Sequence, residues 1–455
     1  MKKIRFLFIN LFNPRLKNEK SYFPLSISYL ISYVNKYLKN ANLIEFSMIN
    51  DCFEENIKKI KPDIVGITCV SQYYGWAKKI SDFSKKIGIK HVIIGGIHIS
   101  LHPESLSKNM DIGVIKEGEQ TFLELMKLFL KYKSFPPEKL NLIKGIAYWD
   151  KKKLKITQNR ELIKDIDKIP FPDRSLFKID TEEAYMFSSR GCPYKCVFCA
   201  SSRLWETTRF HSAEYVFNEI KELVNKYDVK RIHFGDDLFI ANKKRVKKLV
   251  ELLEKENLID KVDFHVGLRA NLVDDDICKL LKRMNVKSIN MGLESGSPQV
   301  LKYLKGDSVT VEDNFNAVEL IKKYGINNCF ATFIIGSPID TKETILETLN
   351  FIKKSKLDSF SIFILTPLPG TPMWEYAKKQ KLIPSDLNNF NWELLGEGFE
   401  VGYPNIHLAK NLSKKELNEL FKKFILEKKK RFVYMAFRTL IFNPLKAIKY
   451  IKKRI

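Results

Sequence analysis

Short apolar runs alternate with helix-period segments over the first 135 residues of the chain. The runs are rich in β-branched and aromatic residues, which favours strands. Between the first two runs, apolar residues recur at the spacing of one helix face, at Leu25, Ile27, Leu30, Ile31 and Val34. This alternation predicts an α/β domain with a doubly wound, Rossmann-like parallel sheet covered by helices on both faces. We expect its strands at residues 3–10, 43–49, 63–70, 91–97 and 112–117.

The same alternation resumes after residue 183 and continues to about residue 380. Helix-period segments, such as residues 213–227 and 311–324, separate the apolar runs in this region. Repeated strand–helix units predict a barrel-like sheet whose active site lies at the carboxyl ends of the strands. The six expected strands span residues 184–188, 230–234, 262–268, 288–293, 329–335 and 360–365.

Proline-punctuated and poorly periodic sequence separates the two alternating regions, at residues 135–137 and 169–173. A rule of roughly 150 residues per domain gives about three domains for a chain of 455 residues. We therefore expect an N-terminal domain at residues 1–135, a linker at 136–182, a second α/β domain at 183–400 and a basic helical extension at 401–455.

The C-terminal extension is amphipathic as well as basic. Ser413 and Glu416 have the spacing of a capping box, and the apolar residues that follow lie on one helix face. A last basic helix is expected after Pro444. Two main interpretations stay open: a helical lid that packs on the preceding domain, or an interfacial anchor on an anionic membrane. Binding of nucleic acid is a third.

Charge and composition narrow the classes of protein. The chain has 78 Lys and Arg against 53 Asp and Glu, and residues 410–455 alone hold 15 of the basic and three of the acidic residues. The remaining excess is spread thinly, which predicts a lysine-rich surface and does not predict a nucleic-acid groove. No apolar run reaches the roughly 18 residues of a membrane span, and no signal-peptide pattern opens the chain. We expect a cytoplasmic protein whose tail could contact the inner face of the membrane.

Three of the seven cysteines lie close together, at Cys192, Cys196 and Cys199. A loop with this spacing can direct three thiolates at one [4Fe-4S] cluster, each to a separate iron, and leave the fourth iron open. The alternative is a zinc knuckle with His211 as the fourth ligand, although structural zinc sites usually pair their ligands in two close couples. The other four cysteines lie in apolar or helical contexts and are expected to be buried.

The segment from Ser188 to Cys199 resembles the signature of the radical S-adenosylmethionine (radical SAM) superfamily, and the likeness continues to about residue 380. The resemblance implies a partial (β/α)6 barrel, S-adenosylmethionine bound to the open iron, and an electron donor such as flavodoxin or ferredoxin. The cofactor then supplies the difficult chemistry, and the protein supplies position and excludes water.

The resemblance also implies the residues that bind S-adenosylmethionine. Phe198 would touch the adenine, and the segment at Gly336 would hold the adenine through its backbone. Glu294 and Ser295 would hold the ribose or the amino group, and Arg269 the carboxylate. A carboxylate such as Glu294, which follows an apolar strand, needs a cationic or hydroxyl partner.

In the N-terminal domain, two glycine-containing segments follow expected strands, where a doubly wound fold binds ligands. Taken alone, a glycine pair after a strand is commonly a structural turn. Beside the radical SAM likeness, these segments resemble the cobalamin-binding domains that precede such enzymes. The resemblance makes Gly95, Gly96, His98, Glu117 and Gly118 candidate cobalamin contacts. The pattern Asp-x-His-x-x-Gly is missing, so we expect cobalamin without a histidine below the cobalt and His98 as a loop residue near the corrin.

The combined resemblance implies an enzyme that methylates an unactivated carbon or phosphorus centre of a small-molecule or lipid-like substrate. A cobalamin-dependent cyclase or rearrangement enzyme, similar to the anaerobic tetrapyrrole cyclases, is the alternative. A cobalamin-binding regulator without turnover would leave the three cysteines unexplained. Transfer-RNA methylthiolation would require a second cysteine set and an RNA-binding module, and neither pattern is in this sequence. The sequence assigns no substrate and no catalytic acid or base.

Overall fold

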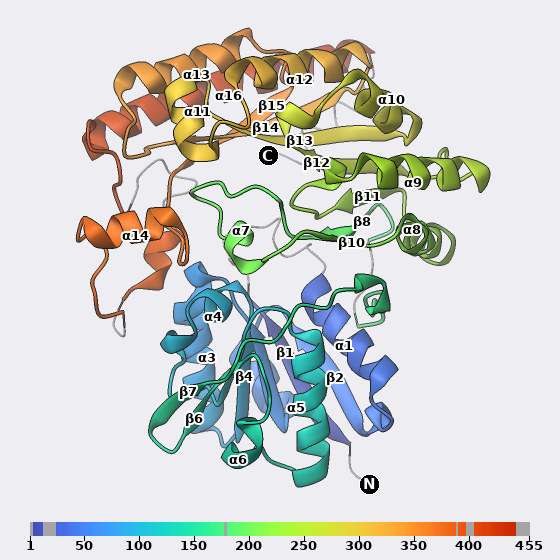
Figure 1. The fold of residues 1–455 in the computed structure, drawn as a ribbon, viewed down its shortest axis with the longest axis vertical. Coiled ribbons are helices and arrows are strands. Elements are labelled where there is room, and N and C mark those ends of the chain that lie inside the picture. The colour runs from blue at the N-terminus through green and yellow to red at the C-terminus, as the bar shows by residue number, and fades with distance from the viewer. Residues whose placement is uncertain (1–2, 12–23, 177–179, 388–389, 397–404, 443–455) are drawn as a thin grey trace. The chain divides into compact units, whose positions relative to one another are not determined.

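The computed structural model describes residues 3–11, 24–176, 180–387, 390–396 and 405–442. The chain divides into two units, each made of several segments (Figure 1). The first unit contains residues 1–191, 199–229 and 368–396, and the second contains residues 192–198, 230–367 and 397–455. A sheet that contains five parallel strands lies at the centre of each unit.

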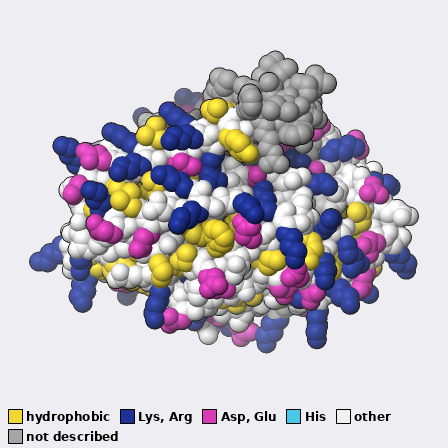
Figure 2. Space-filling model, turned by 90° about the horizontal axis from the view of Figure 1, so that it is seen from above, with side chains coloured by type: hydrophobic (Ala, Val, Ile, Leu, Met, Phe, Trp, Pro, Cys, Tyr) yellow, Lys and Arg dark blue, Asp and Glu magenta, His cyan; other side chains and the backbone are white. Residues whose placement is uncertain are grey.

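Basic side chains are distributed widely over the surface. On the face drawn in Figure 2, Lys and Arg are interspersed with Asp, Glu and single hydrophobic side chains. Several acidic residues pair with lysines, as in the contacts Lys243–Asp276 at 3.0 Å and Lys356–Glu319 at 2.6 Å. The coloured side chains on this face form no continuous basic patch.

A seven-stranded sheet forms the centre of the first unit, in the order β2-β1-β3-β4-β5-β6-β7. The first five strands are parallel and lie where the sequence predicts strands, so the doubly wound topology is confirmed. These strands are β1 (Ile4–Asn10), β2 (Ile44–Ile49), β3 (Ile64–Thr68), β4 (His91–Gly95) and β5 (Ile112–Val114). The helices between and after them are α1 (Leu25–Tyr37), α2 (Phe53–Ile60), α3 (Tyr74–Lys86), α4 (Ile97–Leu101), α5 (Glu119–Tyr132) and α6 (Pro137–Leu140).

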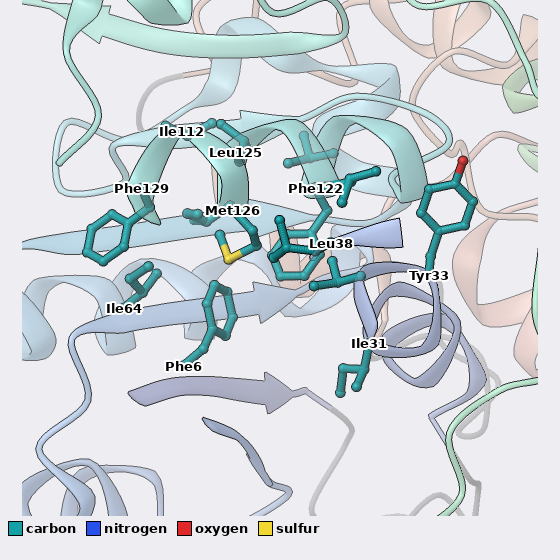
Figure 3. Close-up of a cluster of buried hydrophobic side chains, with 14 of the residues drawn as sticks. Phe6, Ile31, Tyr33, Leu38, Ile64, Ile112, Phe122, Leu125, Met126 and Phe129 are labelled. Atoms are coloured by element: carbon teal, nitrogen blue, oxygen red, sulfur yellow. The ribbon is translucent and has the colours of Figure 1, made fainter. Parts of the chain in front are cut away.

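The core on one face of this sheet is rich in phenylalanine (Figure 3). Phe6 and Phe8 of β1 both contact Phe122 of α5, and the Phe6 and Phe122 rings meet edge to face with centroids 5.2 Å apart. The alternate residues Leu7 and Ile9 point to the opposite face and are also buried. A strand that is buried on both faces has a continuous apolar sequence, which is why β1 could be predicted.

A β-hairpin extends the sheet within the segment expected as a linker. β6 (Ile146–Asp150) pairs antiparallel with β5, and β7 (Lys153–Ile156) pairs antiparallel with β6. Lys151 turns the hairpin in the left-handed region, with φ 56°. The apolar part of β6 is only four residues long and is followed by Asp150 and three lysines, so its periodicity was too weak to predict a strand.

Further elements of the first unit come from segments distant in the sequence. β9 (Ser189–Arg190) and β10 (Arg209–Phe210) form a short antiparallel pair. The others are β8 (Glu183–Met186), α7 (Ser201–Leu204), α8 (Ala213–Tyr227) and α14 (Pro372–Lys379). All six strands expected after residue 183 are therefore present when β8 is counted with the five strands of the second unit.

The second unit contains five parallel strands in the order β15-β14-β13-β12-β11. Their residues alternate between a buried and a half-buried face, as in β12, where Val266 is buried and His265 is half-buried. The strands are β11 (Arg231–Phe234), β12 (Asp263–Leu268), β13 (Val286–Glu294), β14 (Asn328–Ile335) and β15 (Ser359–Ile364). The helices are α9 (Lys243–Lys255), α10 (Asp275–Arg283), α11 (Pro298–Lys305), α12 (Val311–Lys323), α13 (Lys342–Lys354) and α16 (Lys414–Phe442).

Helix α16 begins with the expected capping box. The Ser413 hydroxyl donates to the Glu416 carboxylate at 2.7 Å, and the Glu416 N–H donates to the Ser413 hydroxyl at 3.2 Å. Leu417, Phe421 and Phe424, on the expected apolar face, are buried. This face of the helix is therefore part of the core of the second unit.

Arg431 fastens the same helix to the second unit further along. Its guanidinium donates to the backbone carbonyls of Ile352, Ser355 and Leu357. The basic helix expected after Pro444 lies outside the described residues. Within the residues that the structure describes, no helix is long and apolar enough to cross a membrane.

Candidate functional site

The three cysteines belong to a loop that the β9–β10 pair closes. Arg190 of β9 is paired with Arg209 of β10, and residues 191–208 connect them. Gly191 has φ 88°, and a Cβ at this position would lie 2.9 Å from the carbonyl oxygen of Thr207. Only glycine tolerates both the conformation and the close approach. The neck of the loop therefore has a defined geometry directly before Cys192.

The thiols of this loop suit an iron–sulfur cluster. Cys192, Cys196 and Cys199 form no disulfide and are partly accessible to solvent. Among the described residues, no three His, Cys, Asp or Glu side chains converge on a single metal ion. A [4Fe-4S] cluster does not require such convergence, because each thiolate binds a separate iron. By the chemistry of its donors, the loop fits the cluster.

The histidine of the zinc alternative has other partners. His211 is buried, and its Nδ1 lies 3.1 Å from the Asp167 carboxylate. Its ring stacks on Tyr215, with centroids 3.9 Å apart. These contacts do not favour His211 as a zinc ligand.

The remaining cysteines divide into two kinds. Cys69, Cys278 and Cys329 are buried as expected, and burial raises the pKa of Cys278 and Cys329 to about 12. The prediction was wrong for Cys52, which is exposed. Cys52 precedes α2 in the left-handed region with φ 46°, so it lies in a surface turn and not on the apolar face of the helix.

Arg269 lies beside the cysteine segment of the second unit. Its Nη1 lies 3.5 Å from the Cys196 sulfur, and the guanidinium carbon lies 3.8 Å from the centroid of the Tyr194 ring. Arg269 also donates to Ser308 at 2.8 Å and to Asn271 at 3.0 Å, which holds the guanidinium in one orientation. A buried cation at this place stabilises a thiolate.

A second buried cation, Lys305, was missed in the sequence. It ends α11, and its ammonium group donates to the Gly292 carbonyl. Burial lowers the pKa of Lys305, whereas Glu294 and the thiols of Cys196 and Cys192 oppose this change. A lysine in the last turn of an amphipathic helix normally faces solvent, so no sequence signal distinguishes Lys305.

Glu294 ends β13 in the left-handed region, with φ 64°. The pairing of β13 with β14 shifts register between Gly292 and Glu294, and such irregularities redirect a side chain at the end of a strand. Burial raises the pKa of the Glu294 carboxyl, and the positive charges of Lys305 and Arg269 oppose the rise. Among the described residues, the carboxylate forms no hydrogen bond or ion pair. It can therefore accept a hydrogen bond from a ligand amine or hydroxyl.

Ser295 and Gly336 have clear roles in the fold of the second unit. The Ser295 hydroxyl lies 3.0 Å from that of Thr348 and accepts the Ser297 N–H at 3.0 Å. Gly336 has φ 84°, and a Cβ there would lie 3.1 Å from the Leu417 side chain. These contacts shape the ends of β13 and β14. Phe198 is half-buried.

In the first unit, three protein groups donate hydrogen bonds to the Glu117 carboxylate. Arg190, Arg209 and the backbone N–H of Ile163 donate to it at 2.6, 2.9 and 2.8 Å. Burial tends to raise the pKa of Glu117, but the two arginines hold it below its usual value. The neighbouring Glu119 also binds Arg190, at 2.6 Å.

The three candidate glycines differ in the space around them. Gly96 has φ 101°, and a Cβ there would lie 2.5 Å from the Cys69 carbonyl oxygen, so the fold itself requires glycine. A Cβ at Gly118 would lie 3.1 Å from the Leu30 side chain. At Gly95 the nearest atom would be the Val114 Cβ at 3.9 Å, an ordinary van der Waals distance. Gly95 is therefore the least crowded of the three candidate glycines.

His98 is fully buried, and both of its ring nitrogens have partners. Nδ1 lies 3.0 Å from the Ser71 hydroxyl, and Nε2 lies 2.9 Å from that of Ser105. The ring stacks on Tyr74 and meets Trp392 edge-on, and burial lowers the pKa of His98 to about 3. His98 lies in the short helix α4 and not in a loop, so that part of the prediction was wrong. Its contacts fit a neutral histidine whose ring nitrogens are already hydrogen-bonded.

Three thiols in one loop and a buried arginine against one of them fit an iron–sulfur site, and comparison with known proteins gives the class. Residues 186–352 match the Radical SAM superfamily, and residues 18–126 match the B12 binding domain. The chain belongs to the radical SAM superfamily, in the group whose members carry a cobalamin-binding domain. Its cofactors are a [4Fe-4S] cluster, S-adenosylmethionine and cobalamin, as the sequence predicts.

Known proteins similar to this chain include both methyltransferases and a cyclase. An uncharacterised methyltransferase of Pyrococcus horikoshii is 33% identical over 382 residues, which cover 81% of this chain and 80% of that protein. The anaerobic magnesium-protoporphyrin IX monomethyl ester cyclase of Cereibacter sphaeroides is 25% identical over 376 residues, covering 77% of this chain and 60% of the cyclase. The solved structure of the radical SAM methyltransferase TsrM from Kitasatospora setae, with cobalamin and cluster bound, has a TM-score of 0.70 at 16% identity, over 84% of this chain and 76% of that chain. The structural match shows a shared fold.

Proposed function

We propose that this radical SAM enzyme methylates an unactivated carbon or phosphorus centre of a small-molecule or lipid-like substrate. The observation that carries the proposal is the relative named as a methyltransferase, which is similar over four fifths of both chains. The substrate contributes the hydrogen that is replaced. Two molecules of S-adenosylmethionine and two external electrons are consumed, and the products are the methylated substrate, S-adenosylhomocysteine, 5′-deoxyadenosine and methionine.

In this proposal, the charged residues of the second unit bind S-adenosylmethionine. The cluster, when bound, supplies the electron that cleaves the sulfonium. Arg269 and Lys305 would neutralise the methionine carboxylate and the thiolates, since both cations are buried close to Cys196. Glu294 would accept hydrogen bonds from the amino group or the ribose, because its buried carboxylate needs a donor. Phe198, Ser295 and the backbone at Gly336 would complete the adenosine site.

A half-reaction tests the proposal without the substrate. The protein is reconstituted anaerobically with iron, sulfide and cobalamin, reduced, and mixed with S-adenosylmethionine. We expect an initial burst of S-adenosylhomocysteine that equals the bound cobalamin. With a true substrate, S-adenosylhomocysteine and 5′-deoxyadenosine should then form in equal amounts.

A second candidate function is a cobalamin-dependent radical cyclisation or rearrangement. The similarity to the cyclase of Cereibacter sphaeroides favours it. Such an enzyme would form 5′-deoxyadenosine without S-adenosylhomocysteine. If 5′-deoxyadenosine forms but the burst of S-adenosylhomocysteine is absent from the same sample, the methyltransferase proposal is wrong and the cyclase function is favoured.

For the first unit, we propose that cobalamin lies at the carboxyl ends of the strands, beside Gly95. Replacing Gly95 by Trp should prevent cobalamin binding, because the larger side chain fills the space beside the backbone. His98→Ala should leave the Co(II) electron paramagnetic resonance spectrum of bound cobalamin unchanged, because both imidazole nitrogens already bond to serines. Nitrogen hyperfine coupling that disappears in His98→Ala would contradict this assignment.

We further propose a cytoplasmic location, an electron donor such as flavodoxin or ferredoxin, and peripheral membrane contact through α16. The outer face of this helix carries exposed Leu426, Val433 and Tyr434, with relative exposures of 58%, 65% and 65%. Lysines at positions 422, 423, 429 and 430 are exposed around this apolar line. An apolar centre between lysines complements the surface of an anionic bilayer.

Substitutions on this outer face avoid the buried residues of α16. We compare full-length Lys429→Glu/Lys430→Glu with Lys244→Glu/Lys247→Glu, two exposed lysines of α9, in co-sedimentation with phosphatidylglycerol vesicles. The α16 variant should bind at least about tenfold more weakly, since each of the two basic residues contributes about 1 kcal/mol near such a surface. Leu426→Ser/Val433→Ser should remove the salt-resistant part of the binding. Equal losses in the α9 and α16 variants, or no binding by the parent chain, would refute membrane contact.

A further inference from the structure

The neck of the cysteine loop contains two arginines that face each other. Arg190 and Arg209 are directly paired across β9 and β10, and their side chains are only 12% and 9% exposed. Like charges opposite each other destabilise an antiparallel pair, and buried charges are poorly screened by water. The strand pair that closes the loop therefore needs a counter-charge.

Glu117 supplies that counter-charge from a different part of the first unit. One carboxylate oxygen lies 2.6 Å from Arg190, and the other lies 2.9 Å from Arg209. Glu119 adds a second contact to Arg190, whose two terminal nitrogens thus bind two different carboxylates. This geometry fixes the position of Arg190, which is two residues before Cys192.

The same segment also reaches the far side of the loop. Lys116 lies 2.6 Å from Glu206, which follows the last cysteine. Lys116 has φ 61°, a left-handed conformation that is uncommon outside glycine. Residues 116–119 therefore contact the chain both before Cys192 and after Cys199.

We propose that Glu117 is a positioning residue for the iron–sulfur cluster and not a cobalamin contact. By joining Arg190 to Arg209, it holds the neck of the loop closed and keeps the three thiols in the arrangement that receives the cluster. A buried ion pair contributes little net stability compared with apolar packing, but the loss of one partner leaves a buried charge uncompensated. Neutralising Glu117 should therefore open the neck and loosen the cluster.

The test uses full-length Glu117→Gln, reconstituted anaerobically with iron, sulfide and cobalamin. Three quantities are measured: iron per chain, the rate at which a ferrous chelator removes the iron, and bound cobalamin from its absorption spectrum. We expect iron to be lost at least about tenfold faster, because two buried arginines are left facing each other. Bound cobalamin should stay at the level of the parent chain.

A matched control separates this role from general destabilisation. Glu219 and Arg174 form another buried ion pair of the first unit, at 2.8 Å, with side chains 1% and 4% exposed. Glu219→Gln should lower the thermal unfolding temperature to a similar extent and leave the rate of iron loss unchanged. In Glu117→Gln/Arg209→Gln, which removes one of the two facing cations, iron loss should return towards the parent rate.

Three results would overturn the proposal. Release of cobalamin with a normal rate of iron loss would make Glu117 a cobalamin contact. If iron loss is accelerated equally in Glu219→Gln, the faster loss in Glu117→Gln reflects only a less stable fold. Iron loss in Glu117→Gln at the parent rate would show that the neck does not depend on this carboxylate. If Glu117→Gln does not fold, the rate of iron loss is compared instead between the parent chain, Glu117→Asp and the double variant Glu117→Gln/Arg209→Gln.

Discussion

Glu117 of the first unit and Glu294 of the second unit look alike in the sequence and differ in the structure. Both follow apolar runs, and both were predicted to contact a cofactor. Two arginines and a backbone N–H donate to Glu117. Among the described residues, no group donates to Glu294, although Lys305 and Arg269 are near enough to influence its charge.

The pKa values of the two carboxyls move in opposite directions for this reason. Protein cations hold the pKa of Glu117 below its usual value, whereas burial raises that of Glu294. A buried carboxylate whose partners are all supplied by the protein has a structural role. A buried carboxylate without such partners marks the place where a ligand belongs.

The largest effect should come from the cluster ligands. Replacing Cys192, Cys196 and Cys199 together by Ala removes every thiolate of the loop, so cluster absorption and S-adenosylmethionine cleavage should both be lost. The Glu117 network does not include these thiols, so folding and cobalamin binding should persist. Visible spectra and product analysis by mass spectrometry measure both. Reconstitutable iron with cleavage activity in the triple variant would disprove the cluster assignment.

The second largest difference should be in the free energy of unfolding of variants at Glu117 and Glu294. Glu117→Gln should lower the free energy of unfolding by about 3 kcal/mol, because it leaves the buried Arg209 without a carboxylate and Arg190 with Glu119 alone. Glu294→Gln should leave the stability unchanged or raise it, because it removes a buried charge that lacks a protein partner. Thermal unfolding of the cluster-free chains gives both values. A similar loss in the two variants would show that the contrast between the carboxylates is wrong.

Affinity for S-adenosylmethionine should show the reverse order. Glu294→Gln and Lys305→Met should each weaken binding about tenfold, equivalent to about 1.4 kcal/mol, if they hold opposite charges of the ligand. Equilibrium dialysis against the cluster-loaded protein measures the dissociation constant. Lys302→Met, at an exposed lysine on the same helix, serves as the control for Lys305. Unchanged affinity in Glu294→Gln would remove this residue from the site.

The smallest effect should be the dependence of these stability differences on pH. The lowered pKa of Glu117 contributes stability above the usual Glu pKa of about 4.3, and this contribution is lost as pH falls through the lowered value. The raised pKa of Glu294 has the opposite sign: its relative stabilisation is present below about pH 4.3 and is lost as pH rises through the raised value. The gap between Glu294→Gln and the parent should therefore widen with rising pH just above 4.3. The deficit of Glu117→Gln should instead shrink below 4.3, as thermal unfolding of cluster-free chains can show.

The parts of the molecule that depend on local spacing could be predicted from the sequence. The interval between Cys192, Cys196 and Cys199 predicted a cluster loop, because one short segment carries all three candidate ligands. The strands β1, β3, β4 and β5 were predictable because burial on both faces produces apolar runs, whereas β2 is mostly half-buried and was recognised by its β-branched and aromatic residues. The capping box of α16 is local in the same sense.

The tertiary structure alone decided which charged residues meet. Lys305 resembles any lysine near the end of a helix until the fold buries it near Glu294. The sequence around Glu117 predicts a residue that faces a ligand. In the fold, Glu117 instead binds Arg190 and Arg209, which are more than seventy positions away in the sequence. The start of α16 and its apolar face were predictable, but its extent to Phe442 was not predicted, and whether the tail packs on the protein or on a membrane was left open. Hydrophobic periodicity and the spacing of metal ligands are properties of short segments. The pairing of charges that are distant in the sequence depends on the topology and on the low dielectric of the interior.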